Sequence, residues 1–485
     1  MLKLASVIAL AGVFPAISVA QQSFEPLKIG SVVFSGTLRS RIENWTWFTP
    51  TTGDPKYTYD GSTIRFGISQ KRNFFDWAIE LEAPVLLHLP DNAVGPGAQG
   101  QLGLGASYYI ANGKATNAAM IFPKQAFIRW KLLNSETATV RVGRFEFQDG
   151  GEVAAKDPTI GVIKRDRIQQ RLLGPFGFTH IMRSFDGFHY VYNKPKLNFT
   201  LIGAVPTRGV FQVDGWGWVR TAFAYASVTG QVQKKSTTGE WRLFEIYYDD
   251  WRHVLKQDNR PAAVRAGDLT NIRIVTYGGH YVQVTKTGVG SVDLMGEFAL
   301  QTGRWGAQSQ RAGMVDLEGG WQPKIMPRLK PWVRAGYYYG SGDNNPNDGK
   351  HGTFFQILPT VRPYARFPFF DMSNNVDRFA MLTLRPHARV TFKSEVHSLR
   401  LASHNDLWYT GGGVFQPWTF GYTGRANPGA TSLGNLFDAN FDITVNAHFS
   451  VTPYYGYAAG KSVVQAIYPK GKVGHLGFLE LNYRF

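Results

Sequence analysis

The feature that most restricts the fold of this chain is the alternation of apolar and polar residues in its last segment. Side chains of a β-strand point alternately to opposite faces, so one face of such a segment suits lipid and the other suits water. Strands of membrane barrels carry this pattern, and a half-buried edge strand of a soluble sandwich is the alternative. The apolar residues are Phe485, Tyr483, Leu481 and Leu479, and the polar residues between them are Arg484, Asn482 and Glu480.

The same alternation recurs along the chain, with no sustained helical period. Its longest run covers 437–451, where every second residue is apolar, and we expect one strand there. Around 141–147 the charged residues fall on both faces, so the pattern gives no register. A tilted crossing strand needs about 9 to 11 residues. We therefore predict an all-β fold: an antiparallel transmembrane barrel of about 18 strands (16 to 18), closed by a C-terminal strand that ends in Phe485.

The N-terminal residues have the composition of an export leader. Lys3 precedes an apolar stretch that ends in the small residues Ser18-Val19-Ala20, which suit a signal peptidase. We expect a signal peptide at 1–20, cleaved near Ala20, and one barrel domain at 21–485 in the outer membrane of a Gram-negative-type bacterium. No later stretch offers the roughly 18 consecutive apolar residues of a transmembrane helix.

Composition agrees with a barrel that has a polar interior. Aromatic residues make up 14% of the chain, yet the mean hydropathy is only −0.20. Cysteine is absent, which excludes disulfides and thiolate metal sites. The formal net charge is +17, but export makes nucleic acid an unsuitable partner. Positive charge inside a barrel would instead attract anions.

Two stretches resemble the alginate export family of outer-membrane porins. One is Arg-Ala-Gly-Tyr-Tyr-Tyr-Gly-Ser-Gly-Asp at 334–343, followed by Asp-Gly-Lys-His-Gly-Thr-Phe-Phe-Gln-Ile-Leu-Pro-Thr at 348–360. The other is Gly-Arg-Phe-Glu at 143–146, followed by Arg-Ser-Phe-Asp-Gly at 183–187. The resemblance implies an 18-stranded barrel with an arginine-rich lumen that passes an acidic polysaccharide such as alginate. It does not carry over substrate contacts by position.

The resemblance also implies a set of partners. The terminal aromatic of such barrels is read by the barrel assembly machinery, so Phe485, with Tyr483 and Leu481, is the expected assembly signal. The other expected partners are outer-membrane lipid, anionic polysaccharide and periplasmic proteins of polysaccharide synthesis or export. No cofactor is implied.

Charged residues opposite the apolar stripes are the candidates for the lumen. Arginine presents a planar fork of donors that suits carboxylates, whereas lysine acts as a point charge. The alternative for each residue is that its charge only braces a water-filled wall. The cationic candidates are Arg39, Arg41, Arg65, Arg129, Lys131, Arg334, Arg389 and Lys393. The expected acidic partners are Glu43, Glu80, Glu82, Asp293, Glu297 and Glu395.

Two rival functions and one weak metal site complete the predictions. A porin for small organic anions would use the same lumen, whereas an outer-membrane lipid hydrolase needs Ser and His facing lipid or the rim. His397 and His448 are instead expected to face the lumen, so no catalytic residue is assigned.

One loop holds several side chains with oxygen ligands that could bind calcium. The Gly after them comes one position late for a calcium-binding loop and no Glu closes the loop, which favours a plain turn. These residues are Asp343, Asn345, Asn347 and Asp348.

Proline, glycine and asparagine clusters predict five long loops outside the barrel. They cover 89–114, 149–178, 249–268, 340–377 and 411–434.

Overall fold

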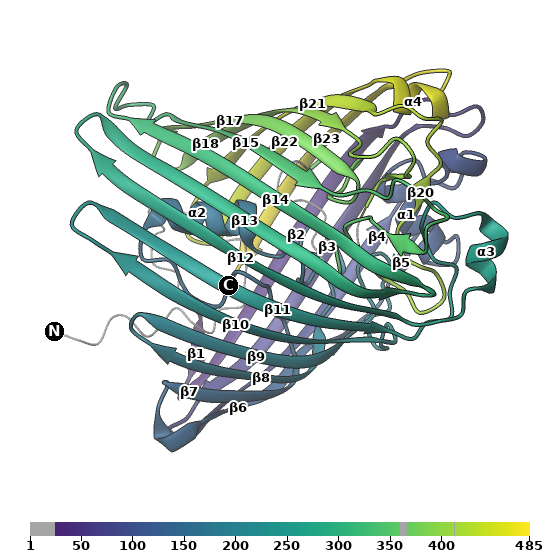
Figure 1. Ribbon diagram of the computed structural model, residues 1–485. Helices are drawn as coiled ribbons and strands as arrows, with labels where there is room; N and C mark the ends of the chain where they lie inside the picture. The colour runs from purple at the N-terminus through teal and green to yellow at the C-terminus, as the bar shows by residue number, and fades with distance from the viewer. Residues whose placement is uncertain (1–24, 359–365, 412) are drawn as a thin grey trace.

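The computed structural model describes residues 25–358, 366–411 and 413–485, so the predicted leader at 1–20 lies outside the described residues. Eighteen strands form a closed antiparallel barrel, as predicted (Figure 1). Each strand pairs with its neighbour along the chain, and β23 closes the ring on β2. The wall strands are β2 (Val32–Thr46), β3 (Lys56–Lys71), β4 (Phe75–Leu87), β6 (Phe122–Lys131), β7 (Ala138–Phe145), β8 (Phe185–Lys194), β9 (Leu197–Pro206), β10 (Thr221–Gln233), β11 (Thr237–Asp250), β12 (Ile272–Thr287), β13 (Gly290–Trp305), β14 (Gln308–Pro323), β15 (Trp332–Gly340), β17 (Asn375–His387), β18 (Val390–Arg400), β21 (Ser432–Thr444), β22 (Phe449–Gly460) and β23 (Val473–Arg484).

Short elements decorate this wall. The short strands are β1 (Leu27–Ile29), β5 (Ala118–Ala119), β16 (Lys350–His351), β19 (Trp408–Tyr409) and β20 (Gly424–Arg425). The helices are α1 (Leu104–Ala111), α2 (Pro158–Ile163), α3 (Ala262–Gly267) and α4 (Ser462–Ile467), with 3₁₀ turns η1 (Gly97–Gln99) and η2 (Leu132–Asn134) and a π-helical turn η3 (Lys164–Ile168). Within the described ranges, none of these helices is long and apolar enough to cross a membrane.

The two ends of the barrel differ in the length of their connections. At one end, which we call the turn end, β8 and β9 are joined through 195–196 and β12 and β13 through 288–289. At the opposite loop end lie long connections such as 88–121 and 401–431, together with α1, α3 and α4 (Figure 1). Bacterial barrels place short turns in the periplasm and long loops outside the cell, which orients this barrel.

The predicted faces of the strands are confirmed where the alternation is clear. On β2, Leu38 and Ile42 are 41% and 51% exposed on the outer surface, whereas Arg41 and Glu43 are 2% and 0% exposed inside. A ring of apolar side chains thus faces lipid, because each wall strand sends alternate residues to each face.

The prediction of one strand over 437–451 is wrong. The strand β21 ends at Thr444, and β22 begins at Phe449 after a turn. The Asn446 side chain accepts hydrogen bonds from the backbone N–H groups of His448 and Phe449 and shapes this turn. The turn has an even number of residues, so the apolar period continues through it. His448 is therefore in an exposed turn rather than on the lumen wall.

The structure also resolves the segment whose register the sequence left open. Val142 is 44% exposed on the outer face of β7, so the neighbouring Arg141 faces inward. Arg144 lies opposite Asp186 on β8 and forms a bidentate ion pair with it, with both N···O distances 2.7 Å. The two arginines of β7 therefore point to opposite faces of the wall. Gly143 lies between them and has a φ of +124°, and a Cβ at this position would collide with the backbone of the adjacent strand.

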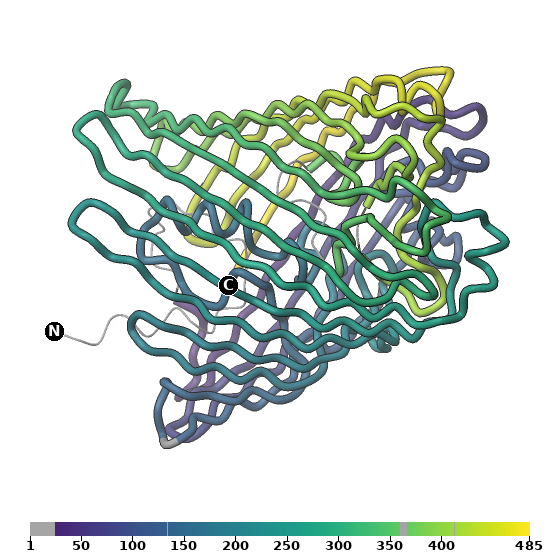
Figure 2. The backbone as a smooth tube through the Cα atoms, in the orientation of Figure 1, coloured from purple at the N-terminus to yellow at the C-terminus, as the bar shows by residue number. Residues whose placement is uncertain are grey.

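The connection 146–184 between β7 and β8 folds into the barrel, and we call it the inner segment. In Figure 2 the tube of this segment runs inside the outline of the wall, where Figure 1 labels α2, and the segment also contains η3. The predicted outside loop at 149–178 is therefore wrong in its placement. A loop can turn inward only if the wall supplies partners for its polar groups.

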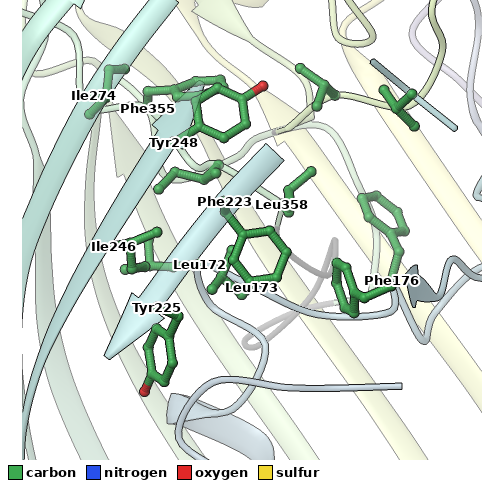
Figure 3. Packing of buried hydrophobic residues seen from close by; sticks show 14 of the residues in the cluster. Leu172, Leu173, Phe176, Phe223, Tyr225, Ile246, Tyr248, Ile274, Phe355 and Leu358 are labelled. Carbon is green, nitrogen blue, oxygen red and sulfur yellow. The ribbon is translucent and has the colours of Figure 1, made fainter. Parts of the chain in front are cut away.

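Apolar side chains of the inner segment pack against the inner wall of the barrel (Figure 3). Leu358, from the loop after β15, also pairs with the inner segment: its N–H donates to the Leu172 carbonyl at 2.7 Å, and its own carbonyl accepts from the Gly174 N–H at 2.7 Å. Both stretches that resemble the alginate export family therefore contribute residues to one hydrophobic core inside the barrel. The labelled members of that core are Leu172, Leu173, Phe176, Phe223, Tyr225, Ile246, Tyr248, Ile274, Phe355 and Leu358.

Candidate permeation site inside the barrel

Cations of the inner segment are bound to carboxylates of the wall. The Lys164 Nζ lies 2.6 Å from a Glu240 oxygen of β11. Arg171 is fully buried and reaches Glu297 of β13 and Asp316 of β14, each at 2.8 Å. These buried pairs join the inner segment to three strands of one side of the wall, β11, β13 and β14, which fixes its position across the lumen.

On the opposite wall, β2 holds the inner segment through its arginines. Arg39 donates from Nη1 to the Gly177 carbonyl at 2.8 Å. Arg41 donates from Nη2 to the Phe178 carbonyl at 2.8 Å and from Nε to Glu43 at 2.8 Å. Two predicted lumen residues therefore lie inside the barrel, where they bind backbone carbonyls that no strand pairs.

Arg65 is the centre of a buried cluster on β3, β4 and β6. Its guanidinium lies 2.7 Å from Glu82, 3.0 Å from Glu146 and 3.4 Å from Glu80. Lys124 adds a second cation 3.3 Å from Glu146. Three carboxylates surround two cations, so this cluster braces the wall and presents no excess positive charge.

Arg334 and Lys393 connect other parts of the wall to the inner segment. Arg334 binds Asp293 and lies 2.7 Å from Glu318, whose other oxygen is 2.8 Å from Arg167 of η3. Lys393 of β18 lies 2.9 Å from Asp166 of the same turn. These two predicted cations therefore face inward and are matched by acids.

The remaining predicted cations lie at the turn end. Arg129 and Lys131 both bind Asp76 and Glu136 around the turn after β6, with Lys131 to Asp76 at 2.9 Å. The prediction for Arg389 is wrong: it lies in the exposed turn between β17 and β18, because the alternation was extended one residue beyond the start of the strand.

Each predicted acidic partner has a basic neighbour inside the barrel. The observed pairs are Glu43 with Arg41, Glu80 and Glu82 with Arg65, Asp293 with Arg334, Glu297 with Arg171, and Glu395 with His397.

Sequence reasoning missed Arg242 and the cations of the inner segment. Arg242 is buried on β11, 3.3 Å from Glu152, and the exposed Leu243 beside it carries the same alternation that identified Arg41. The inner segment has no strand period, and nothing in its local sequence marks Lys164 or Arg171 as interior residues.

Several interior arginines form no ion pair with a carboxylate in the described ranges, and three of them are Arg39, Arg141 and Arg183. Arg141 binds the His189 ring at 2.8 Å and the Glu146 carbonyl. Arg183 is fully buried and donates to the Val414 carbonyl at 2.9 Å. An arginine keeps its proton in proteins, so Arg183 remains charged at neutral pH. These residues carry positive charge that no described carboxylate within ion-pair distance neutralises.

The candidate metal loop is a series of turns. The Asp343 carboxylate accepts from the Asn345 N–H, the Asn345 side chain accepts from the Asn347 N–H, and Asp348 accepts from the Lys350 N–H. No group of three or more His, Cys, Asp and Glu side chains placed to hold a metal occurs in the ranges that the structure covers.

The C-terminal aromatic residues lie on the outer face. Phe485, Tyr483 and Leu481 are 45%, 45% and 38% exposed. The backbone of Phe485 exchanges two hydrogen bonds with Gly36, and its ring occupies the place that a Gly36 side chain would need. Recognition of this end by the assembly machinery stays a prediction.

The family model for alginate export matches residues 114–464. Among solved structures, the outer-membrane protein OpdK of Pseudomonas aeruginosa is 8% identical with a TM-score of 0.53 over 93% of this chain and 98% of that one. OccK9 (OpdG) of Pseudomonas aeruginosa and OccAB2 of Acinetobacter baumannii are each 9% identical over 94% of this chain and 98% of theirs, with TM-scores of 0.59 and 0.57. At such identities the likeness concerns the fold. A search of curated protein sequences found no match.

Proposed function

We propose that this outer-membrane channel, which belongs to the alginate export family, passes anionic polysaccharide or smaller acidic solutes through its lumen. The family and the fold are those of channels, which are not enzymes. We also propose that a leader is removed near Ala20 before assembly, and that periplasmic proteins of polysaccharide synthesis or export deliver the cargo.

The observation that carries this proposal is the set of unmatched arginines, Arg39, Arg141 and Arg183. Most interior cations are neutralised by acids and hold the inner segment, so they add little net field. An arginine without a carboxylate in a low-dielectric interior attracts anions strongly, because little water screens it. Its planar fork suits the carboxylate of a uronate, and sites of moderate strength let a polymer move on.

A porin for small organic anions is the second candidate. The inner segment occupies part of the lumen and packs Leu172 and Phe176 against the wall, which favours small solutes over a polymer. One fold neighbour, OpdK, has a structure described with vanillate, a small aromatic carboxylate. The two candidates share the same cationic path and differ in the size of the solute.

Block of single-channel current in planar bilayers tests the proposal. We expect uronate oligomers added to one side to interrupt the current, and the triple variant Arg39→Gln, Arg141→Gln, Arg183→Gln to lose most of this block. A charge-matched control removes Lys286, Lys324 and Arg389, which are exposed at the turn end.

Equal block of the parent channel and the triple variant would contradict the proposed role of the unmatched arginines. Block by vanillate without block by uronate oligomers would favour the small-anion porin. No block by any organic anion would refute both candidates.

A further inference from the structure

A row of arginines lies on the outer surface of the barrel at its loop end. All five belong to the lipid-facing side of their strands, as the exposure of alternate residues shows, and all five are exposed. They lie within four residues of the loop-end terminus of each strand. We call them the arginine rim: Arg273 of β12, Arg304 of β13, Arg311 of β14, Arg378 of β17 and Arg400 of β18.

The strand register brings three members of the rim together. Arg273 lies directly opposite Arg304, and Arg311 lies opposite Thr302, two residues from Arg304 on the same face. Directly opposite residues are about 5 Å apart and diagonal ones about 7 to 8 Å, within reach of a guanidinium. Like charges placed opposite each other repel, so this arrangement is unfavourable unless an anion lies between them.

Acidic residues do little to neutralise the rim. Asp249 pairs with Arg273 at 3.3 Å, and the Arg273 side chain stays 57% exposed. In the ranges described by the structure, Arg304, Arg311 and Arg378 form no hydrogen bond or ion pair. At least three guanidinium groups therefore present all their donors to the surroundings.

Below the rim, toward the middle of the membrane, the same strands expose large apolar side chains. Tyr277 of β12 is 47% exposed, Leu300 of β13 is 57% exposed and Leu317 of β14 is 57% exposed. Val396 of β18 continues this belt at 48%. Charge lies above and an apolar surface below, which matches a molecule with an anionic head and hydrocarbon chains.

We infer that the arginine rim binds the phosphate groups of lipid headgroups in the outer leaflet, with the acyl chains against the apolar belt. The oxygens of one phosphate group can accept hydrogen bonds from two guanidinium groups at once, and the negative charge relieves the repulsion between Arg273 and Arg304. The loop end faces out of the cell, so the lipid belongs to the outer leaflet. This inference does not depend on what passes through the lumen.

The rim can be tested by native mass spectrometry of the full-length barrel in detergent with bis-phosphorylated lipid A as the probe. We expect the triple variant Arg304→Gln, Arg311→Gln, Arg378→Gln to bind at least tenfold more weakly than the parent. The control variant Lys286→Gln, Lys324→Gln, Lys330→Gln removes three exposed charges at the turn end and should bind like the parent.

Two further measurements distinguish the source of the phosphate. Lipid A without phosphates should bind at least tenfold more weakly, and millimolar inorganic phosphate should not displace the lipid. Equal binding by the triple variant, or equal binding of the dephosphorylated lipid, would overturn the inference. Displacement by millimolar inorganic phosphate would also overturn the inference, because it would show a general anion site and not a lipid site. If the triple variant does not fold, as judged by heat-modifiable mobility, the single variants Arg304→Gln and Arg311→Gln give the same comparison.

Discussion

Replacing Arg171 by Met should release the inner segment from the wall. Arg171 is fully buried and lies 2.8 Å from both Glu297 and Asp316, so its loss removes a cation at ion-pair distance from two buried carboxylates, although Arg242 still lies 3.5 Å from Glu297. Removing one partner of a buried ion pair costs about 3–5 kcal/mol. A tenfold change in an equilibrium corresponds to about 1.4 kcal/mol. The released form of the segment should therefore gain about two to three and a half orders of magnitude in population relative to the packed form.

Single-channel recording and limited proteolysis would detect this release. We expect larger and noisier conductance, and faster trypsin cleavage within the inner segment. The variant Arg171→Met, Glu297→Gln, Asp316→Asn also neutralises these two carboxylates and should recover much of the packing. Arg208→Met is the control, because Arg208 pairs with Asp214 at 3.1 Å on the surface, where such pairs contribute about 0–1 kcal/mol. Parental conductance and proteolysis in Arg171→Met would refute the view that these pairs hold the segment.

Three further predictions concern the wall, its closure and the loops. Cysteine at Phe441 should react with lipid-soluble probes and cysteine at Asp442 with water-soluble ones; equal labelling would contradict the face assignment. Replacing Phe485 by Asp should lower the amount of folded barrel, because its ring packs over Gly36; unchanged heat-modifiable mobility would count against this. Burial raises the pKa of Asp406 from 3.8 to about 6, so its contribution to loop stability is full below about pH 4 and is lost as the pH rises through 6. Loop proteolysis should therefore be slower at pH 5 than at pH 7.5, and Asp406→Asn should remove this difference.

The wall of the barrel could be predicted because each wall residue obeys a local rule. Arg41 and Ile42 face opposite sides wherever the strand is placed, since the period of a strand is two. The same rule fails at strand ends: it continued through the turn at Asn446 and included Arg389, because alternation carries no information about where a hairpin turns. Turn-forming side chains such as Asn446 are the local signal that marks such an end.

The inner segment could not be predicted from local pattern. Its position depends on partners more than fifty residues away in sequence, such as Glu240 for Lys164 and Asp316 for Arg171. The sequence therefore identified most of the wall cations that face inward and six acids as their expected partners, but not the charged residues of the inner segment that pair with the wall. That difference moves the expected anion field from residues such as Arg65 to the unmatched Arg39, Arg141 and Arg183.

The reversal potential of the parent channel in a tenfold KCl gradient tests the central claim most directly. If the lumen holds an excess of unneutralised arginine, chloride should permeate faster than potassium, and the reversal potential should have the corresponding sign. The preference should weaken at high salt, where screening shortens the reach of the charges. A reversal potential near zero, or one of the sign that reports faster potassium permeation, would contradict the account.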